Sequence, residues 1–246
     1  MKFGVKSDRG IIRELNEDSY NLITGYPNVP VCFIIADGMG GHNSGEVASR
    51  TAVDSISNSI LQQGEALSDE SKIQETIENI IYKANSEIYE LSKQQVQNSG
   101  MGTTLILSVI VNKKLYIGHL GDSRVYVVRD GMMERITTDH SYIEELIKNG
   151  SISRQEALNH PQKNLITRAL GCFEQIEVDT FSCNVKDNDI FLMCTDGLTN
   201  MVDEETIKDI LERYDDPEKA CEELVREANA RGGEDNITVI VFKEEI

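Results

Sequence analysis

The sequence lacks the features that mark several large classes of protein. It has no tryptophan and only four prolines. It also has no apolar run near the ~20 residues that a membrane-spanning helix requires. Its first residues lack the apolar region of a signal peptide. The five cysteines include no Cys-x-x-Cys pair, so we expect free, buried thiols in a reducing cytoplasm and no membrane association.

Basic residues are scarce relative to acidic ones. The 246 residues include 24 Lys and Arg against 42 Asp and Glu, which gives a formal net charge of −18. A field of this sign repels phosphate backbones, so it argues against a nucleic-acid-binding protein. The length and the 39% hydrophobic content are sufficient for a full core. We expect a monomer.

Short apolar segments typical of strands occur in blocks, and helical patterns interrupt them in pairs. Amphipathic helices are predicted at 44–63 and 70–97, with two more around 207–211 and 220–228. This order favours an α+β fold in which antiparallel strands form a sandwich with helices on both faces. The predicted strands are 2–7, 19–24, 31–36, 103–111, 114–120, 124–129, 177–184, 189–195 and 237–243.

The segment 138–176 differs from the rest of the chain. It is polar, with short helices predicted around 142–148 and 154–158, followed by His160-Pro161. We interpret it as an insertion between two strands and as a candidate flap. No linker, repeat or low-complexity tract divides the sequence, so we expect a single domain over 1–246.

Two apolar runs end at an Asp-Gly pair, at Asp37-Gly38 and at Asp196-Gly197. Each run predicts a short buried strand that ends in a turn, where glycine permits a positive backbone angle. The aspartates would then stand at the rim of a sheet beside exposed carbonyl groups. Oxygen ligands of this kind bind hard divalent cations.

Three more aspartates are expected at the same end of the sheets. Asp235 precedes the strand 237–243, and an antiparallel arrangement would bring it beside the two Asp-Gly carboxylates. Asp18 likewise precedes a strand. Asp122 is expected at the tip of a tight hairpin over 115–126.

Several carboxylates at close range repel one another, and divalent cations relieve this repulsion. Two such ions lower the pKa of a shared water and hold a phosphoryl group. Arg13 offers a planar donor fork suited to phosphate oxygens. The combination indicates metal-assisted hydrolysis of phosphate esters. Taken singly, each residue has a plainer interpretation: the Asp-Gly pairs and Asp122 as ordinary turns, and Arg13 and Glu17 as surface charges.

Several motifs resemble those of bacterial-type metal-dependent type 2C (PPM) serine/threonine protein phosphatases. They follow the order of that family and extend over nearly the whole chain. The matching segments are Ser7–Asp18, Asp37–His42, Met101–Thr104, Gly121–Arg124, Asp139–Ser141, His160-Pro161, Ile166–Gly171, Asp196–Leu198 and Gly233–Thr238.

The resemblance implies a four-layer α-β-β-α sandwich around two Mn²⁺ or Mg²⁺ ions. Asp37 would bridge both ions, the Gly38 carbonyl would bind one, and Asp196 and Asp235 would bind the other. A metal-bridging hydroxide would attack phosphorus in line and release phosphate from phosphoserine or phosphothreonine. By analogy, the partners would be phosphorylated proteins, including a Ser/Thr protein kinase and its substrates.

Four further residues acquire roles from the same resemblance. Asp18 and Glu17 would orient metal-bound waters. Asp122, together with Asp196, would form a third and weaker metal site near the flap. Arg13 would hold the substrate phosphate.

One departure from the family pattern concerns the proton donor. Many eukaryotic members have a histidine directly after Asp-Gly, proposed to protonate the leaving group, whereas this chain has Met39. His42 lies three residues further on. We therefore expect a metal-bound water at the third site to serve as the acid.

Other phosphatase and nucleotide-hydrolase signatures are missing. The sequence has no Cys-x₅-Arg and no Gly-x₄-Gly-Lys-Ser/Thr, and Asp187-Asn188-Asp189 precedes a strand where an aspartyl-phosphate enzyme would place it after one. Two alternatives from other classes remain. One is a catalytically inactive metal-binding scaffold of the same fold, and the other is a simple cation-binding domain.

Overall fold

The computed structural model describes residues 1–40, 44–94, 96–157 and 160–244. Its strands are β1 (Lys2–Asp8), β2 (Asp18–Ile23), β3 (Val31–Met39), β4 (Gly102–Thr103), β5 (Leu105–Val111), β6 (Lys114–Leu120), β7 (Arg124–Arg129), β8 (Met132–Arg135), β9 (Asp179–Asn184), β10 (Ile190–Cys194) and β11 (Ile237–Lys243). Its helices are α1 (Ser44–Gln62), α2 (Gly64–Leu67), α3 (Ile73–Gln94), the 3₁₀ turn η1 (Val96–Asn98), α4 (Tyr142–Lys148), α5 (Arg154–Ala157), α6 (Asp196–Thr199), α7 (Glu204–Arg213) and α8 (Pro217–Ala230).

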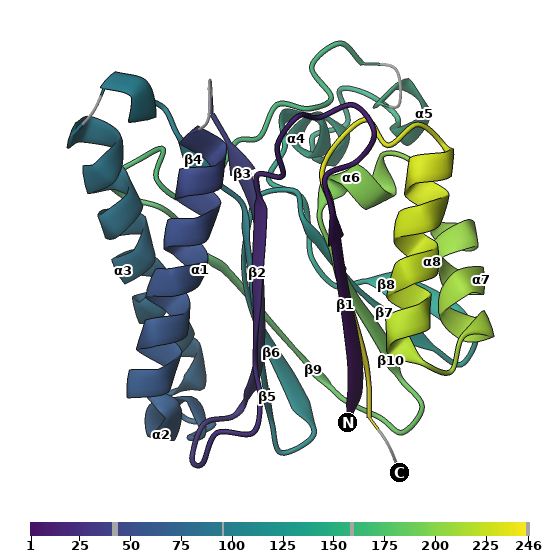
Figure 1. Ribbon diagram of the computed structural model, residues 1–246, viewed down its shortest axis with the longest axis horizontal. Helices are drawn as coiled ribbons and strands as arrows, with labels where there is room; N and C mark the ends of the chain where they lie inside the picture. Colours follow the sequence, from purple (N-terminus) through teal and green to yellow (C-terminus); the bar gives the residue numbers. More distant parts are fainter. Residues whose placement is uncertain (41–43, 95, 158–159, 245–246) are drawn as a thin grey trace.

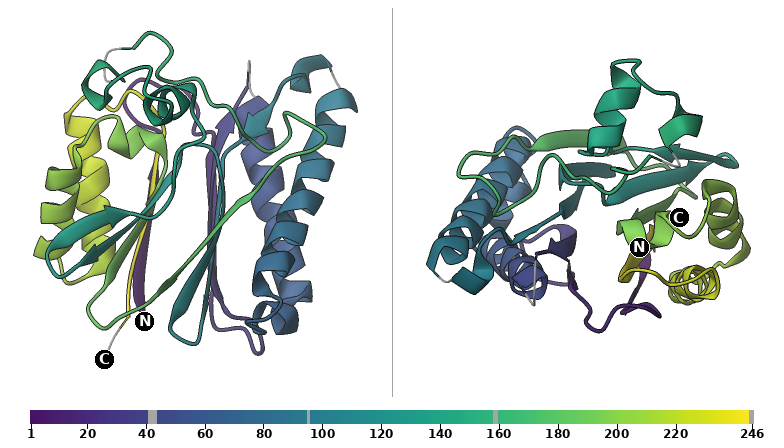
Figure 2. Two further views of the ribbon diagram at one scale, coloured as in Figure 1. Left: turned by 180° about the vertical axis from the view of Figure 1, so that it is seen from behind. Right: turned by 90° about the horizontal axis from the view of Figure 1, so that it is seen from above.

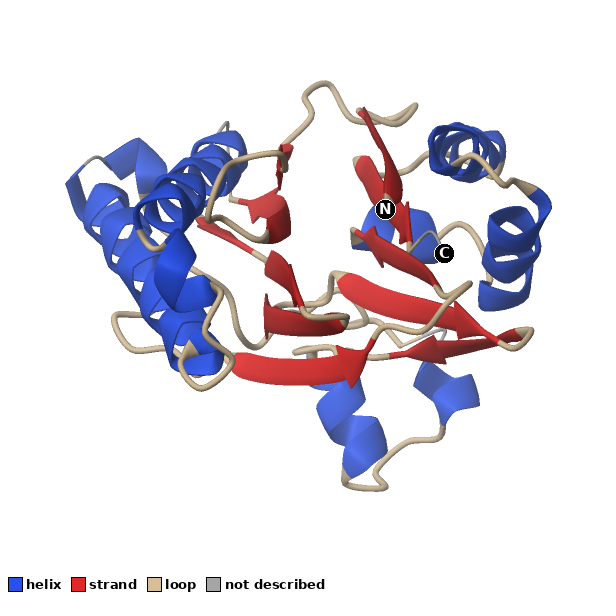
Figure 3. Cartoon of the chain, turned by 90° about the horizontal axis from the view of Figure 1, so that it is seen from below, coloured by secondary structure: helices blue, strands red, loops and turns tan. Residues whose placement is uncertain are grey.

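The strands form two antiparallel sheets that face each other. One sheet has the order β1-β11-β10-β7-β8, and the other has the order β2-β3-β5-β6-β9, with β4 paired to β3. Helices α1 and α3 cover the second sheet, and α7 and α8 cover the first (Figure 1). The view from below separates the four layers (Figure 3). The predicted α+β sandwich is confirmed.

Three apolar cores fill the spaces between the four layers. Along β3, Cys32 and Ile34 face the α1–α3 side, whereas Phe33 and Ile35 face the other sheet. The core between the sheets stacks Phe191 on Phe242, with ring centroids 4.9 Å apart. Because the central strands are buried on both faces, they are apolar at nearly every position. This explains why the strands were easy to predict as continuous apolar runs.

Two local predictions were wrong about how strands end. The expected hairpin over 115–126 does not form, because β6 and β7 belong to different sheets. The turn that carries Asp122 crosses from one sheet to the other instead. Gly121 in this turn has a φ of +99°, which glycine adopts without steric cost. Asp122 is thereby placed between the sheets.

The Asp-Gly pairs are not turns either. Strand β3 continues through Asp37-Gly38 to Met39, and Asp196-Gly197 begins helix α6. Neither glycine is required for a positive φ. Both are required for close packing: a Cβ on Gly38 would collide with the carbonyl oxygen of Gly45, and one on Gly197 with that of Asn236.

Replacing Gly38 by alanine is therefore expected to destabilise the protein by about 3 kcal/mol, because the collision is with rigid backbone. Gly25→Ala is a useful control. Gly25 has a φ of +75° but nothing within 4 Å of an added Cβ, so only backbone strain of about 1 kcal/mol is expected. Urea denaturation of both variants in chelator measures the difference. Equal losses would contradict the steric explanation.

The segment between β8 and β9 crosses from one sheet to the other and includes α4 and α5. It lies at one end of the sandwich, against the strand ends (Figure 2). That it acts as a flap stays a prediction. The elements α2, α6 and β8 were not predicted. Among the described residues, no helix has the length and apolar character to cross a bilayer, and all five cysteines are free thiols.

Candidate active site

A cavity of about 370 Å³ opens between the two sheets at the end predicted from the sequence. Seven of the eight predicted site residues line it, and the eighth, Asp18, is buried behind it with 8% of its surface exposed. The remaining wall comes from Met39, Gly40 and residues 164–166 of the α4–α5 segment. The seven predicted residues are Arg13, Glu17, Asp37, Gly38, Asp122, Asp196 and Asp235.

Asp37 is fixed by the strands on either side of it. It lies opposite Asp18 in the β2–β3 register, and its backbone N–H donates to the Thr104 hydroxyl at 3.0 Å. Its carbonyl oxygen accepts from the Thr103 hydroxyl at 2.8 Å. Burial, followed by repulsion from the neighbouring aspartates, raises the pKa of Asp37 well above its ordinary value.

Asp18 is held by two buried threonines from the other sheet. Its Oδ2 accepts from Thr238 at 2.7 Å and from Thr195 at 3.1 Å. Its Oδ1 is buried and has no hydrogen-bond partner in the described chain. Burial raises the pKa of Asp18 to about 7, although the two hydroxyl donors oppose the shift. Asp18 thus joins the two sheets and still has an unsatisfied oxygen.

The carboxylates of Asp122 and Asp196 are buried and repel each other. Burial raises the pKa of Asp122 to about 8, with repulsion from Asp196 adding to the shift. Burial likewise raises the pKa of Asp196 to about 6, and repulsion from Asp235 contributes. One oxygen of Asp122 is buried without a partner among the described residues, whereas Asp196 accepts from Asn200 at 3.0 Å.

Asp235 forms an ion pair with Arg13 at the wall of the cavity. The Arg13 guanidinium donates to Asp235 Oδ2 at 2.7 Å, and both side chains are partly exposed. Glu17 lies nearby, and burial raises its pKa. The arginine predicted to hold phosphate therefore neutralises one of the predicted metal ligands here.

Asn236 fixes the loop that carries Arg13. Its side-chain amide donates to the carbonyl oxygens of Arg9 at 2.9 Å and Leu15 at 2.8 Å. Its Oδ1 accepts from the backbone N–H of Glu17 at 2.8 Å. Sequence reasoning assigned no role to Asn236 or to the threonines that bind Asp18 and Asp37. Thr195 and Asn236 adjoin predicted site residues, and Thr103, Thr104, Asn236 and Thr238 lie within the motifs that resemble the family. These were the signals available.

The donor set fits hard divalent cations. It consists of oxygens, several carboxylates have raised pKa values, and two buried carboxylate oxygens lack partners in the described chain. No group of three acidic, histidine or cysteine side chains among the described residues is already arranged to hold an ion. Asp235, one of the predicted ligands, is paired with Arg13 instead. The Gly38 carbonyl and water would complete the coordination.

The predicted departure at the proton-donor position involves two residues. Met39 lines the cavity and offers no ionisable group. His42 lies outside the described residues, so the expectation that a metal-bound water, and not His42, serves as the acid stays a prediction.

The comparisons with known proteins agree with this geometry. A model of the protein phosphatase 2C family matches residues 12–229. The serine/threonine phosphatase stp of Listeria monocytogenes is 38% identical over 241 residues, which cover 98% of this chain and 95% of the relative.

Solved structures extend the similarity to the whole fold. The S. agalactiae serine/threonine phosphatase has a TM-score of 0.93 at 34% identity, with 99% of each chain covered. The catalytic domain of the serine/threonine protein phosphatase PstP, solved in complex with two manganese ions, has a TM-score of 0.84 at 31% identity, with 98% of this chain and 96% of that catalytic-domain chain covered. The chain therefore belongs to the protein phosphatase 2C family of serine/threonine protein phosphatases.

Proposed function

We propose that the protein removes phosphate from phosphoserine and phosphothreonine in proteins by metal-dependent hydrolysis. The observation that carries this proposal is the cavity in which Asp37 and the carboxylates that repel it lie beside Arg13. Such a cluster is unfavourable without cations, and with cations it attracts a phosphate. The relatives named serine/threonine phosphatase stp and protein phosphatase PhpP support the same conclusion.

We propose a role for each residue that lines the cavity. Asp37, the Gly38 carbonyl, Asp196 and Asp235 would hold two Mn²⁺ or Mg²⁺ ions. Bound ions of this kind lower the pKa of water and offset the charge of a phosphate undergoing in-line attack. An ion held by Asp235 would weaken the Arg13–Asp235 ion pair, and the Arg13 guanidinium could then bind the phosphate oxygens.

Hydrolysis of a phosphothreonine peptide tests the function. Wild-type protein with Mn²⁺ should release phosphate, whereas chelator or the Asp196→Ala substitution should reduce the rate by about 100-fold or more. Activity that survives chelation would overturn the metal mechanism. Metal binding without hydrolysis of any phosphopeptide would favour the inactive scaffold.

The biological setting is proposed by analogy alone. We place the protein in the cytoplasm as a monomer that acts on phosphorylated proteins, among them a Ser/Thr protein kinase and the substrates of that kinase.

Asp122 is proposed as a ligand of a third ion that supplies the acid for the leaving group. Asp122→Ala is then expected to lower kcat by about 10-fold to 100-fold while two ions still bind. Steady-state kinetics at saturating Mn²⁺ and calorimetric metal titration measure these two effects. Wild-type kcat in Asp122→Ala would exclude this role.

A further inference from the structure

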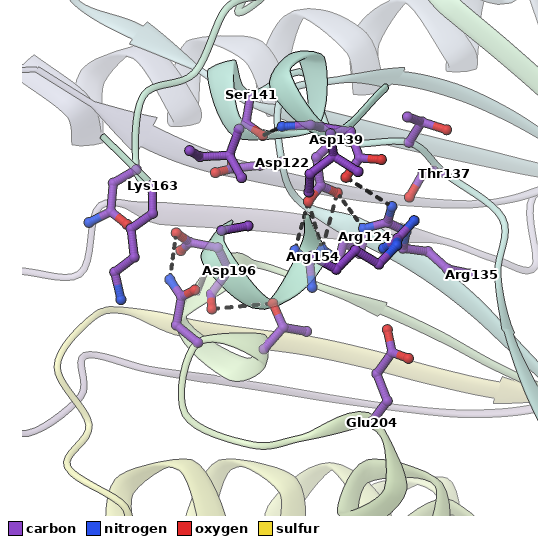
Figure 4. Close-up of a pocket in the computed structure, with 18 residues that line it drawn as sticks. Asp122, Arg124, Arg135, Thr137, Asp139, Ser141, Arg154, Lys163, Asp196 and Glu204 are labelled. Carbon is purple, nitrogen blue, oxygen red and sulfur yellow. Dashed lines mark hydrogen bonds and ion pairs between the residues drawn. The ribbon is translucent and has the colours of Figure 1, made fainter. Parts of the chain in front are cut away.

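A second and larger cavity adjoins the metal-site cavity. It has a volume of about 730 Å³ and lies beside α4 and α5 (Figure 4). The two cavities share Asp122, Asn164 and Asp196 as lining residues. A ligand bound at the metal site can therefore extend into the second cavity without leaving the protein surface. Its size is that of pockets that enclose ligands of several hundred daltons.

One wall of the second cavity is a fixed network of charges. Arg124 contacts Asp139 at 2.7 Å, and Arg135 contacts the same carboxylate at 3.3 Å. Arg135 also contacts Glu144 at 3.5 Å. The two arginines and two carboxylates neutralise each other, so this wall is rigid and contributes no net charge.

Two further cations line the cavity without such partners. The Arg154 guanidinium and the Lys163 ammonium are exposed, and neither forms an ion pair or side-chain hydrogen bond with any described residue. In Figure 4 the labelled arginines lie on one side of Asp196 and Lys163 lies on the other. The other acid here, Glu204, accepts from the Tyr126 hydroxyl at 3.1 Å.

Four cations and five carboxylates line this cavity, and two of the carboxylates are those shared with the metal site. Ions held at the metal site would offset the charge of these two, which leaves four cations facing three carboxylates. The whole chain, in contrast, has a net charge of −18. A local surplus of cations on an acidic protein directs an anion to one place.

We propose that this cavity, with Arg154 and Lys163, binds a second anionic side chain of the substrate. The inference rests on the proposed phosphatase function. The phosphorylated residue occupies the metal site, and a carboxylate or second phosphate a few residues away pairs with Arg154 or with Lys163. A peptide extends about 3.3 Å per residue, so such a side chain can reach the adjoining cavity. Acidic or multiply phosphorylated segments are then the preferred substrates.

A peptide series tests the proposal. Phosphothreonine peptides of one sequence carry a single glutamate, or a single phosphoserine, at successive positions on either side, and an all-alanine peptide is the reference. Wild-type kcat/KM should be about tenfold higher for at least one anionic position. Comparison of the glutamate and phosphoserine peptides identifies which anion is preferred. Hydrolysis of p-nitrophenyl phosphate, which carries no peptide, measures the catalytic activity of the metal site separately.

Matched variants assign the effect to the two cations. The Arg154→Ala/Lys163→Ala variant should lose the tenfold preference, and the Arg154→Glu/Lys163→Glu variant should disfavour the anionic peptides. Lys148→Ala/Lys186→Ala removes the same charge from exposed lysines outside the cavity and should retain the preference.

The possible failures are distinguishable. Equal kcat/KM for all peptides, or a preference that survives in Arg154→Ala/Lys163→Ala, would overturn this inference while p-nitrophenyl phosphate is still hydrolysed. Wild-type protein that hydrolyses neither kind of substrate would overturn the proposed function itself.

Discussion

Replacing Asp37 by asparagine is expected to abolish catalysis and, at the same time, to stabilise the metal-free protein. Asp37 is the proposed ligand of both ions, so its loss should reduce kcat/KM by about 1,000-fold or more. In metal-free protein, however, the same carboxylate is repelled by Asp18, Asp196, Asp122 and Asp235, and burial adds to the cost of its charge. An amide of the same shape removes this cost.

The stability effect is measured by thermal unfolding in chelator at pH 8. A gain of 1–2 kcal/mol should raise Tm by about 2–8 °C in a domain of this size. Asp54→Asn is the matched control, because Asp54 is an exposed carboxylate on α1 and its loss should change Tm by less than about 1 °C. A lower Tm for Asp37→Asn than for wild type would contradict the repulsion described for this cavity.

The stability of the metal-free protein is expected to fall as pH rises. Folding raises the pKa of Asp196 to about 6, of Asp18 to about 7 and of Asp122 to about 8. The folded state therefore binds more protons than the unfolded state between pH 4 and about pH 8. Stabilisation by these protons is complete below the unfolded pKa of about 4 and is lost as pH rises through the folded values.

Across this range the Tm measured in chelator is expected to fall by roughly 10 °C or more. Mn²⁺ should reverse the trend, because the ions bind deprotonated ligands and their stabilising effect grows with pH. An Asp18→Asn/Asp122→Asn variant should show a flatter profile in chelator. Metal-free wild-type protein that becomes more stable from pH 5 to pH 8 would refute the proposed linkage.

The sequence predicted the site better than it predicted the local backbone. Asp37, Asp196 and Asp235 line one cavity because strands β3, β10 and β11 bring them to the same end of the sandwich. The apolar runs of these strands made that end predictable from the sequence. The prediction of a turn at each Asp-Gly pair was wrong, because strand β3 continues through the first pair and helix α6 begins at the second. Both glycines are required by close packing against neighbouring backbone and not by a turn. The residues next to a glycine in the sequence do not show whether it is there for a turn or for close packing.

Other features depend on residues far apart in the chain. The hydroxyls of Thr195 and Thr238 bind Asp18 across 177 and 220 positions, and no local pattern marks a buried threonine as such a partner. Similarly, Leu115–Tyr126 has the composition of a hairpin, but β6 and β7 pair with other strands. The choice of partner is made by the packing of the whole sandwich.

The pairing of β1 with β11 has a consequence for how the protein is synthesised. These strands align from Lys2↔Lys243 to Asp8↔Ile237, and Arg13 meets Asp235 across 222 positions. A ribosome adds roughly 5–20 residues per second, so an emerging chain waits tens of seconds between making the first and the last of these groups. During that time the growing polypeptide has neither a closed sheet nor a complete ligand set. We therefore expect the nascent chain to have no phosphatase activity until strand β11 has left the ribosome.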